Sequence, residues 1–313
     1  MMAKIIMNPL DAIPVFYTAR MVADSEGYSP SAAKPKAVVA TWQELGLPLS
    51  LREPAPVSLK QLELAHDAAY VTDVLNCVAE NGFGNCSKAV AQSLPYTTGA
   101  MLAAAREALG NGRVAAAPCS GFHHAGYDLG SGFCTFNGLM VTVMVLLGEG
   151  MTGRVGILDL DQHWGDGTQD IIKHLGVGKR VRHYHPRMDL RGNYDATRFL
   201  RTLPDIIAKF SDCALVLYQA GADPHIDDPL GGWLTTEELQ RRDCLVFEGL
   251  AALGVPVAWN LAGGYQRDKN KTIRPVLEIH ENTMKECVRV YVDEAGFCCN
   301  ERNKGREANQ SLV

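Results

Sequence analysis

The chain has 313 residues, 47% of them apolar, which is enough to bury one large core. This composition excludes a disordered chain and a small disulfide-stapled domain. The formal net charge of −5, from 35 acidic and 30 basic residues, gives no basic surface of the kind that nucleic-acid binding requires.

Six short apolar runs predict strands, and helical patterns separate them. In chain order the runs cover residues 14–17, 114–118, 154–160, 180–184, 214–220 and 256–261. This alternation predicts the α/β class, with a single open parallel sheet and helices on both faces. Two helices carry clear end signals. Residues 97–109 run into Gly110-Asn111-Gly112, and 235–253 begin with Thr235 and Glu238 at capping-box spacing.

The chain shows no linker, repeat or change of composition that would divide it. We therefore expect one domain over residues 1–293 and a loosely ordered tail over 294–313. The first 17 residues contain no long apolar run, which predicts neither a secretion signal nor a membrane span. The nine cysteines are odd in number and lack C-x-x-C pairs, which favours a reducing compartment. We expect a cytoplasmic protein that contacts neither membranes nor nucleic acid.

The strongest chemical signal lies at the end of the predicted strand 154–160. Asp159, Asp161 and His163 stand at alternate positions, so in an extended chain their side chains share one face. Gly165 and Gly167 follow and permit a sharp turn close to a bound group. A lone D-x-D usually marks a solvated strand end, but the added histidine and glycines favour half of a metal site.

Three further clusters follow other predicted strands, at the edge where open parallel sheets bind their ligands. His123 and His124 come after strand 114–118 and can act as bases if carboxylates at other strand ends orient them. Asp223 follows strand 214–220 and is well placed as a third metal ligand. Tyr265 follows a Gly-Gly pair after strand 256–261 and can present its phenol to the same crevice. Each residue, taken alone, also suits a structural role.

Together the four clusters supply ligands for a metal, two more histidines, spare carboxylates and a phenol. Three protein ligands leave a fourth position open for water, as in catalytic rather than structural zinc sites. Two anionic ligands neutralise the metal's formal charge and reduce its Lewis acidity, so a second electrophile would help. The Tyr265 hydroxyl can donate a hydrogen bond to a substrate carbonyl and share that task.

These segments, in this order, resemble the zinc-dependent histone deacetylase family of the arginase/deacetylase superfamily. The resemblance spans roughly residues 13–291 and rests on Gly-Phe-His-His at 121–124, Gly-Phe-Cys at 132–134, Asp-x-Asp-x-His-x-Gly-Asp-Gly from 159, Gly-Ala-Asp at 221–223 and Gly-Gly-Tyr at 263–265. The Gly-Phe-His-His form, Leu-Gly-Gly at 230–232 and Gly-Gly-Tyr-Gln resemble most the class IV branch and its small single-domain relatives.

The resemblance implies one zinc ion per chain. Its ligands would be Asp161, His163 and Asp223, a nitrogen and oxygen set that also suits iron(II) or cobalt(II). Binuclear manganese relatives such as arginases carry a carboxylate where Gly165 stands, which favours a single metal here. A structural potassium near the same strand end is a family feature, but His183 stands where relatives supply a hydroxyl ligand.

The same resemblance implies roles for the histidine pair and the phenol. His124 would be the general base, backed by Asp166. His123 would be its electrostatic partner, oriented by Asp159. Tyr265 would polarise the acyl carbonyl of the substrate.

For the substrate channel, the resemblance implies the Gly132 carbonyl as a partner of the substrate amide and Phe133 as one wall. Many relatives line the tunnel mouth with a Pro-Gly-Thr-Gly loop that is missing here. Met188 and Tyr194 are therefore the candidates for the second wall.

The predicted activity is hydrolysis of an N-acyl amide, above all an acyl group on the ε-amine of lysine in a protein or peptide. Two alternatives stay open: a deacylase of acylpolyamines or other small amides, and a catalytically silent protein that binds acyl-lysine. The segment 66–93 looks too short for the insertion that narrows polyamine-deacylase sites. His185 and His225 match no catalytic position, so we expect structural or rim roles for them. The acyl chain length and the oligomeric state do not follow from the sequence.

Overall fold

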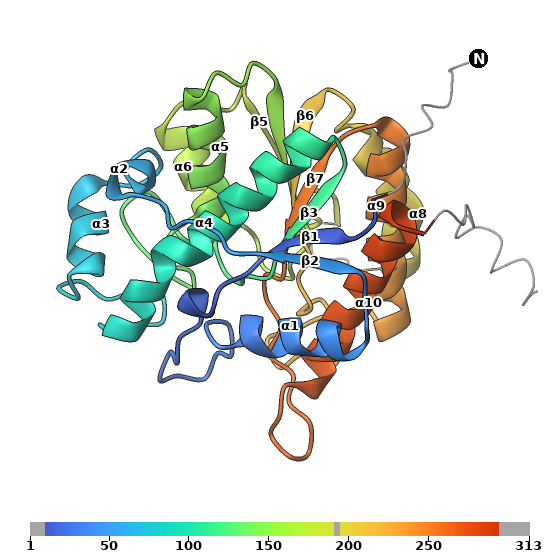
Figure 1. Ribbon diagram of the computed structural model, residues 1–313, viewed down its shortest axis with the longest axis horizontal. Coiled ribbons are helices and arrows are strands. Elements are labelled where there is room, and N and C mark those ends of the chain that lie inside the picture. Colours follow the sequence, from blue (N-terminus) through green and yellow to red (C-terminus); the bar gives the residue numbers. More distant parts are fainter. Residues whose placement is uncertain (1–9, 191–194, 294–313) are drawn as a thin grey trace, which may run out of the picture.

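A single open sheet organises the protein. The computed structural model describes residues 10–190 and 195–293. Seven parallel strands lie in the order β2-β1-β3-β7-β6-β4-β5, with helices on both faces (Figure 1). The predicted fold class is therefore confirmed. The tail over 294–313 lies outside the described residues, so the domain bounds stay a prediction.

The elements alternate along the chain as the sequence predicts. The strands are β1 (Ile13–Phe16), β2 (Leu49–Arg52), β3 (Val114–Ala117), β4 (Arg154–Asp159), β5 (Val181–Tyr184), β6 (Cys213–Gln219) and β7 (Val257–Asn260). The helices are η1 (Ala19–Met21), α1 (Lys34–Glu44), α2 (Leu59–Leu62), α3 (Ala68–Leu75), α4 (Lys88–Asn111), α5 (Gly138–Gly148), α6 (Asp166–His174), α7 (Arg187–Leu190), α8 (Ala196–Ala208), α9 (Thr236–Leu253) and α10 (Arg274–Tyr291).

All six predicted strands are present, each within about one residue of its expected bounds. The edge strand β2 is an addition, because its sequence Leu-Ser-Leu-Arg contains no continuous apolar run and its residues are half-buried or exposed. β2 pairs with β1 alone, with Ile13 opposite Leu49. An edge strand needs burial on fewer sides than a central one, so its sequence carries a weaker signal.

The predicted helix ends are confirmed where the sequence contains a capping motif. Thr235 and Glu238 form the expected capping box of α9. α4 ends at Gly112, which has the left-handed backbone conformation with φ +69°. The start of α4 differs from the prediction, because the helix begins at Lys88 and continues through Pro95.

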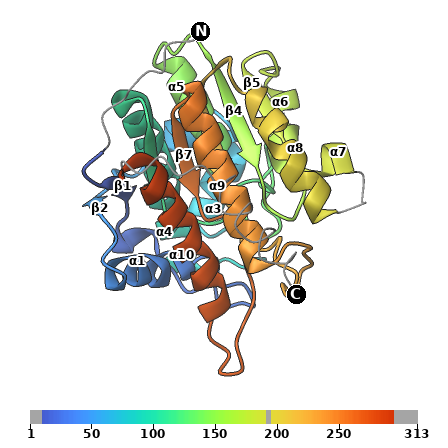
Figure 2. The ribbon, with the colours of Figure 1, turned by 90° about the vertical axis from the view of Figure 1, so that its right-hand side faces the viewer.

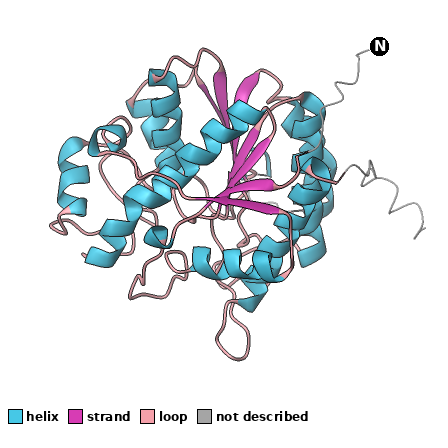
Figure 3. Ribbon diagram, viewed as in Figure 1, coloured by secondary structure: helices cyan, strands magenta, loops and turns pink. Residues whose placement is uncertain are grey.

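The core consists of two apolar layers, one on each face of the sheet. One layer packs α1, α8, α9 and α10 against the strands, and Figure 2 shows the last three in front of the sheet. The other layer packs α3, α4, α5 and α6 on the opposite face. Figure 3 shows the strands as one fan between these helices. With both faces covered, the central strands are buried along their length.

The strand order explains where the chemical residues gather. β3, β7, β6 and β4 are neighbours at the centre of the sheet, and each pair in this series is parallel. The four predicted clusters follow these four strands. Because parallel strands end at the same edge, the clusters share one edge of the sheet.

Two further sequence expectations meet the structure here. Among residues 10–190 and 195–293, no helix is both long and apolar enough to cross a bilayer. Six of the described cysteines are free, namely Cys77, Cys86, Cys119, Cys134, Cys213 and Cys287.

Candidate functional site

Three side chains from two loops meet at the centre of this edge. Asp161 and His163 follow β4, and Asp223 follows β6. Their ligand atoms lie within 4.8 Å of one another. His163 Nδ1 is 3.0 Å from Asp223 Oδ2 and 3.3 Å from Asp161 Oδ1. The structure therefore brings together the three expected metal ligands, as two oxygen donors and one nitrogen donor that suit Zn²⁺.

The two ligand carboxylates are buried beside each other. Burial and the neighbouring Asp161 carboxylate raise the pKa of Asp223 to about 7. A divalent cation between the two groups would offset this unfavourable negative charge.

Gly263 allows the loop after β7 to approach the same carboxylates. Its N–H donates to Asp161 Oδ2 at 2.8 Å. A Cβ atom at this position would lie 2.3 Å from Asp223 Oδ2 and 2.7 Å from Asp161 Oδ2. The first glycine of the Gly-Gly-Tyr motif is thus required by the close approach of backbone to the candidate ligands.

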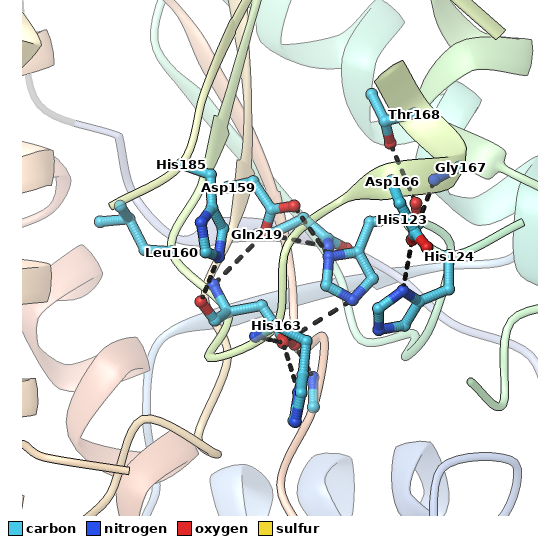
Figure 4. Close-up of polar contacts among 12 residues, drawn as sticks. His123, His124, Asp159, Leu160, His163, Asp166, Gly167, Thr168, His185 and Gln219 are labelled. Atoms are coloured by element: carbon cyan, nitrogen blue, oxygen red, sulfur yellow. Dashed lines mark hydrogen bonds and ion pairs between the residues drawn. The ribbon is translucent and has the colours of Figure 1, made fainter. Parts of the chain in front are cut away.

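The two adjacent histidines lie beside the candidate metal ligands, each on its own carboxylate. His123 Nδ1 is 2.8 Å from Asp159 Oδ2, and His124 Nδ1 is 2.6 Å from Asp166 Oδ1 (Figure 4). The two rings lie 4.2 Å apart between centroids. A carboxylate accepts hydrogen bonds, so each Nδ1 carries the proton and each Nε2 faces away from its partner.

The surroundings shift the pKa values of the two histidines in opposite directions. Burial lowers the pKa of His123, but Asp159 and Asp161 more than offset this and raise it to about 9. Burial and the neighbouring charge of His123 lower the pKa of His124. Two adjacent imidazoles with divergent pKa values suit different tasks, one as a fixed positive group and the other as a proton acceptor.

Tyr265 is buried at the same edge, with 6% of its surface exposed. Burial and the carboxylates of Asp223 and Asp161 raise its pKa well above the usual value, which keeps the phenol protonated as a hydrogen-bond donor. Its backbone N–H donates to Asp228 Oδ2 at 2.8 Å. Backbone hydrogen bonds from Gly263 to Asp161 and from Tyr265 to Asp228 therefore hold the loop that carries the phenol.

Lys34 belongs to the site and was missed from the sequence. This lysine at the start of α1 is fully buried, and its Nζ donates to the carbonyls of Ala262 at 2.7 Å and Gly263 at 3.2 Å. Burial lowers its pKa to about 8, against the opposing effect of Asp223. Lysines are rarely buried, and no local pattern distinguishes Lys34 from an exposed one.

We expect Lys34→Met to lower the kcat of the predicted deacylation by about 10- to 100-fold. The variant removes the ammonium that holds the carbonyls of Ala262 and Gly263, so the phenol of Tyr265 shifts. Lys34→Arg should restore most of the rate, since it keeps a positive donor. Steady-state kinetics of both variants would measure the effect. Equal losses in Met and Arg variants of unchanged thermal stability would contradict this positioning role.

The expected channel residues lie beside the phenol. The Phe133 ring is 5.6 Å from Tyr265 and 5.9 Å from Phe83, between centroids. Tyr28 stacks on Tyr265 at 6.5 Å. Gly132 lies against His124, since a Cβ there would be 2.5 Å from its ring. Phe83 and Tyr28 are aromatic neighbours that the sequence did not single out.

The second wall of the channel stays a prediction. Met188 is partly exposed on α7, and Tyr194 lies outside the described residues. The Nε2 of His225 lies 3.0 Å from Thr236 Oγ1, and its Nδ1 accepts the Asp227 N–H at 3.1 Å. These contacts support a structural role for His225 in the loop after β6.

The structure does not test the potassium ion that the resemblance implies near the end of β4. Hard cations take oxygen ligands. At the end of β4, however, His183 Nε2 lies 4.0 Å from Asp159 Oδ2, and His185 Nε2 lies 3.0 Å from the Asp161 carbonyl. Neither ring nitrogen of His183 has a hydrogen-bond partner among the described residues. Imidazoles border this strand end where a hydroxyl ligand is expected, so potassium stays a prediction.

The fold and site define a class of protein: an α/β protein with a candidate metal site and an adjacent histidine pair at its central strand ends. The family model described as Histone deacetylase domain matches residues 30–181. An uncharacterized protein of Picosynechococcus sp. is 32% identical over 229 residues, which cover 66% of this chain and 76% of that protein. The chain belongs to the histone deacetylase family, whose members hydrolyse amide bonds.

Two named proteins extend the comparison. Histone deacetylase 2 of Arabidopsis thaliana is 28% identical over 181 residues, so the match spans 50% of this chain and 46% of that relative. The crystal structure of acetylpolyamine aminohydrolase from Burkholderia pseudomallei has a TM-score of 0.68 and covers 89% of this chain and 99% of its own. At 17% identity this likeness shows the fold. The resemblance to class IV stays a prediction.

Proposed function

We propose that the protein is a zinc-dependent deacylase that removes an acyl group from the ε-amine of lysine. The observation that carries the proposal is the arrangement of three candidate metal ligands beside two carboxylate-bound histidines. Asp161, His163 and Asp223 would hold one zinc ion. When bound, Zn²⁺ would supply the Lewis acidity that activates water and polarises a carbonyl at neutral pH.

The chain's own residues then have distinct tasks. His124, held by Asp166 through Nδ1, accepts a proton from the attacking water at Nε2 and returns it to the leaving amine. The carbon–oxygen bond forms and the carbon–nitrogen bond breaks, so the products are a carboxylic acid and a free amine. His123, oriented by Asp159, contributes a fixed positive group beside the reaction. Tyr265 donates its hydroxyl hydrogen to the acyl oxygen as negative charge develops there.

The aromatic side chains near the phenol support acyl-lysine as the substrate. Phe133, Phe83 and Tyr28 would contact the apolar methylenes of a lysine side chain while its acyl group reaches the site. Acetylpolyamine amidohydrolase 1 of Pseudomonas aeruginosa, 28% identical over 172 residues, keeps a small acylated amine as the second candidate.

A substrate panel tests the proposal. Acetyl-lysine peptides, longer acyl-lysine peptides and acetylpolyamines are each assayed with untreated protein, with chelator-treated protein, and after zinc is restored. We expect turnover of an acyl-lysine peptide that disappears on chelation and returns with zinc. Faster turnover of an acetylpolyamine would favour the second candidate. Zinc binding with no turnover of any substrate would instead support a silent binding protein.

A further inference from the structure

A fully buried arginine lies behind the two loops that carry the candidate metal ligands. Arg242 on α9 has no exposed surface. Its Nη1 donates to the carbonyl of Leu160 at 3.1 Å and to the carbonyl of Gly221 at 2.7 Å. Leu160 directly precedes Asp161, and Gly221 lies two residues before Asp223. One guanidinium nitrogen thus contacts both ligand loops.

The two carbonyls lie where the hydrogen-bonded ladder between β4 and β6 ends. The last paired residues of these strands are Asp159 and Gln219, followed by a bond from the Leu160 N–H to the Gln219 carbonyl at 3.1 Å. Beyond this point the chains turn to present their side chains. Buried carbonyls that have no partner in the sheet need another hydrogen-bond donor. Arg242 supplies this donor to both loops, the one after β4 and the one after β6.

The guanidinium is itself held in place by a buried carboxylate. Arg242 Nε donates to Asp243 Oδ1 at 2.8 Å. Asp243 also accepts hydrogen bonds from the hydroxyls of Tyr218 and Thr283. The Nη2 of Arg242 has no hydrogen-bond partner among the described residues. Arg242 also lines a cavity of about 10 Å³, the size of one water.

Stability alone gives little reason for such a pair. Removing two charges from water is costly, and well-packed apolar residues often replace a buried ion pair without loss of stability. The contacts of Arg242 with both ligand loops offer a specific reason for its presence. A further hydrogen bond joins the Asp161 carbonyl to His185 Nε2 at 3.0 Å. The backbone carbonyls of Leu160, Asp161 and Gly221, next to the candidate ligands, thus all have side-chain donors.

We infer that Arg242 is a positioning residue that sets the separation of Asp161 and Asp223 and thereby the affinity of the site for zinc. The inference rests on the proposed metal site. It assigns to α9, which carries none of the family motifs, a direct part in building that site.

Two variants separate positioning from general stability. Asp243→Asn removes the negative partner but leaves Arg242 on the two carbonyls. Arg242→Met combined with Asp243→Asn removes both charges and both loop contacts, while the asparagine still accepts the Tyr218 hydroxyl. Zinc affinity of the metal-free proteins is measured by competition with a chromogenic chelator, and thermal stability is measured without zinc.

We expect the double variant to bind zinc about 10- to 100-fold more weakly than wild type. Asp243→Asn should stay within about 3-fold in zinc affinity, although an unpaired buried charge should make it the less stable of the two. Zinc affinity that is unchanged in the double variant, or that follows stability across the three proteins, would overturn the role of Arg242. A wild-type protein that binds no zinc would overturn the proposed metal site itself.

Discussion

Replacing His124 with alanine is expected to lower kcat on an acyl-lysine peptide by about 10²- to 10⁴-fold, the usual contribution of a general base. The side chain is held through Nδ1 by Asp166, and its Nε2 is the atom available to move the proton of the attacking water. Zinc affinity should change little, because His124 is not among the three candidate ligands. Steady-state kinetics with saturating zinc would measure the loss.

His174→Ala provides a matched control for that variant. His174 lies in the last turn of α6 and stacks on Tyr127 at 3.6 Å between ring centroids, outside the candidate site. We expect this variant to keep its rate within about 2-fold, the range usual for surface changes. If His124→Ala retained the wild-type rate within a few-fold, the proton-transfer role would be wrong.

The second large effect is expected for Tyr265→Phe, which should lower kcat by about 10²- to 10³-fold. The change removes the hydroxyl and keeps the ring, so the contacts with Phe133 and Tyr28 remain. Because the phenol acts on charge that develops during the reaction, kcat should fall more than KM rises.

Tyr28→Phe is the appropriate comparison, since it removes a hydroxyl from the ring stacked on Tyr265. We expect its rate to stay close to wild type. A loss confined to KM in Tyr265→Phe would show that the phenol binds the substrate without assisting the chemical step.

The sequence predicts the parts of the fold whose residues are constrained locally. Buried strands such as β4 and β6 have continuous apolar runs, and the capping box of α9 is a local hydrogen-bond pattern. The edge strand β2 lacks such a run, and the first half of α4 is interrupted by Pro95. In both cases tertiary packing decides the structure where the local pattern is weak.

The candidate site divides in the same way. Asp161, His163 and Asp223 stand in short motifs at strand ends, so they can be found before their strands are ordered in space. Lys34 and Arg242 lie on helices, far along the chain from the carbonyls that they hold. Their roles depend on which helix packs behind which loop, and that information is present only in the folded chain.

The separation of the candidate ligands along the chain has a consequence for protein homeostasis. Asp161 and Asp223 are brought together only after β4 and β6 have paired, so an unfolded chain offers zinc no comparable site. Selective binding to the native state adds about 2.7 kcal/mol to the free energy of unfolding when free zinc is 100 times its dissociation constant. With zinc at this site as proposed, zinc supply would set how often the chain opens to proteases, as well as how fast the protein works.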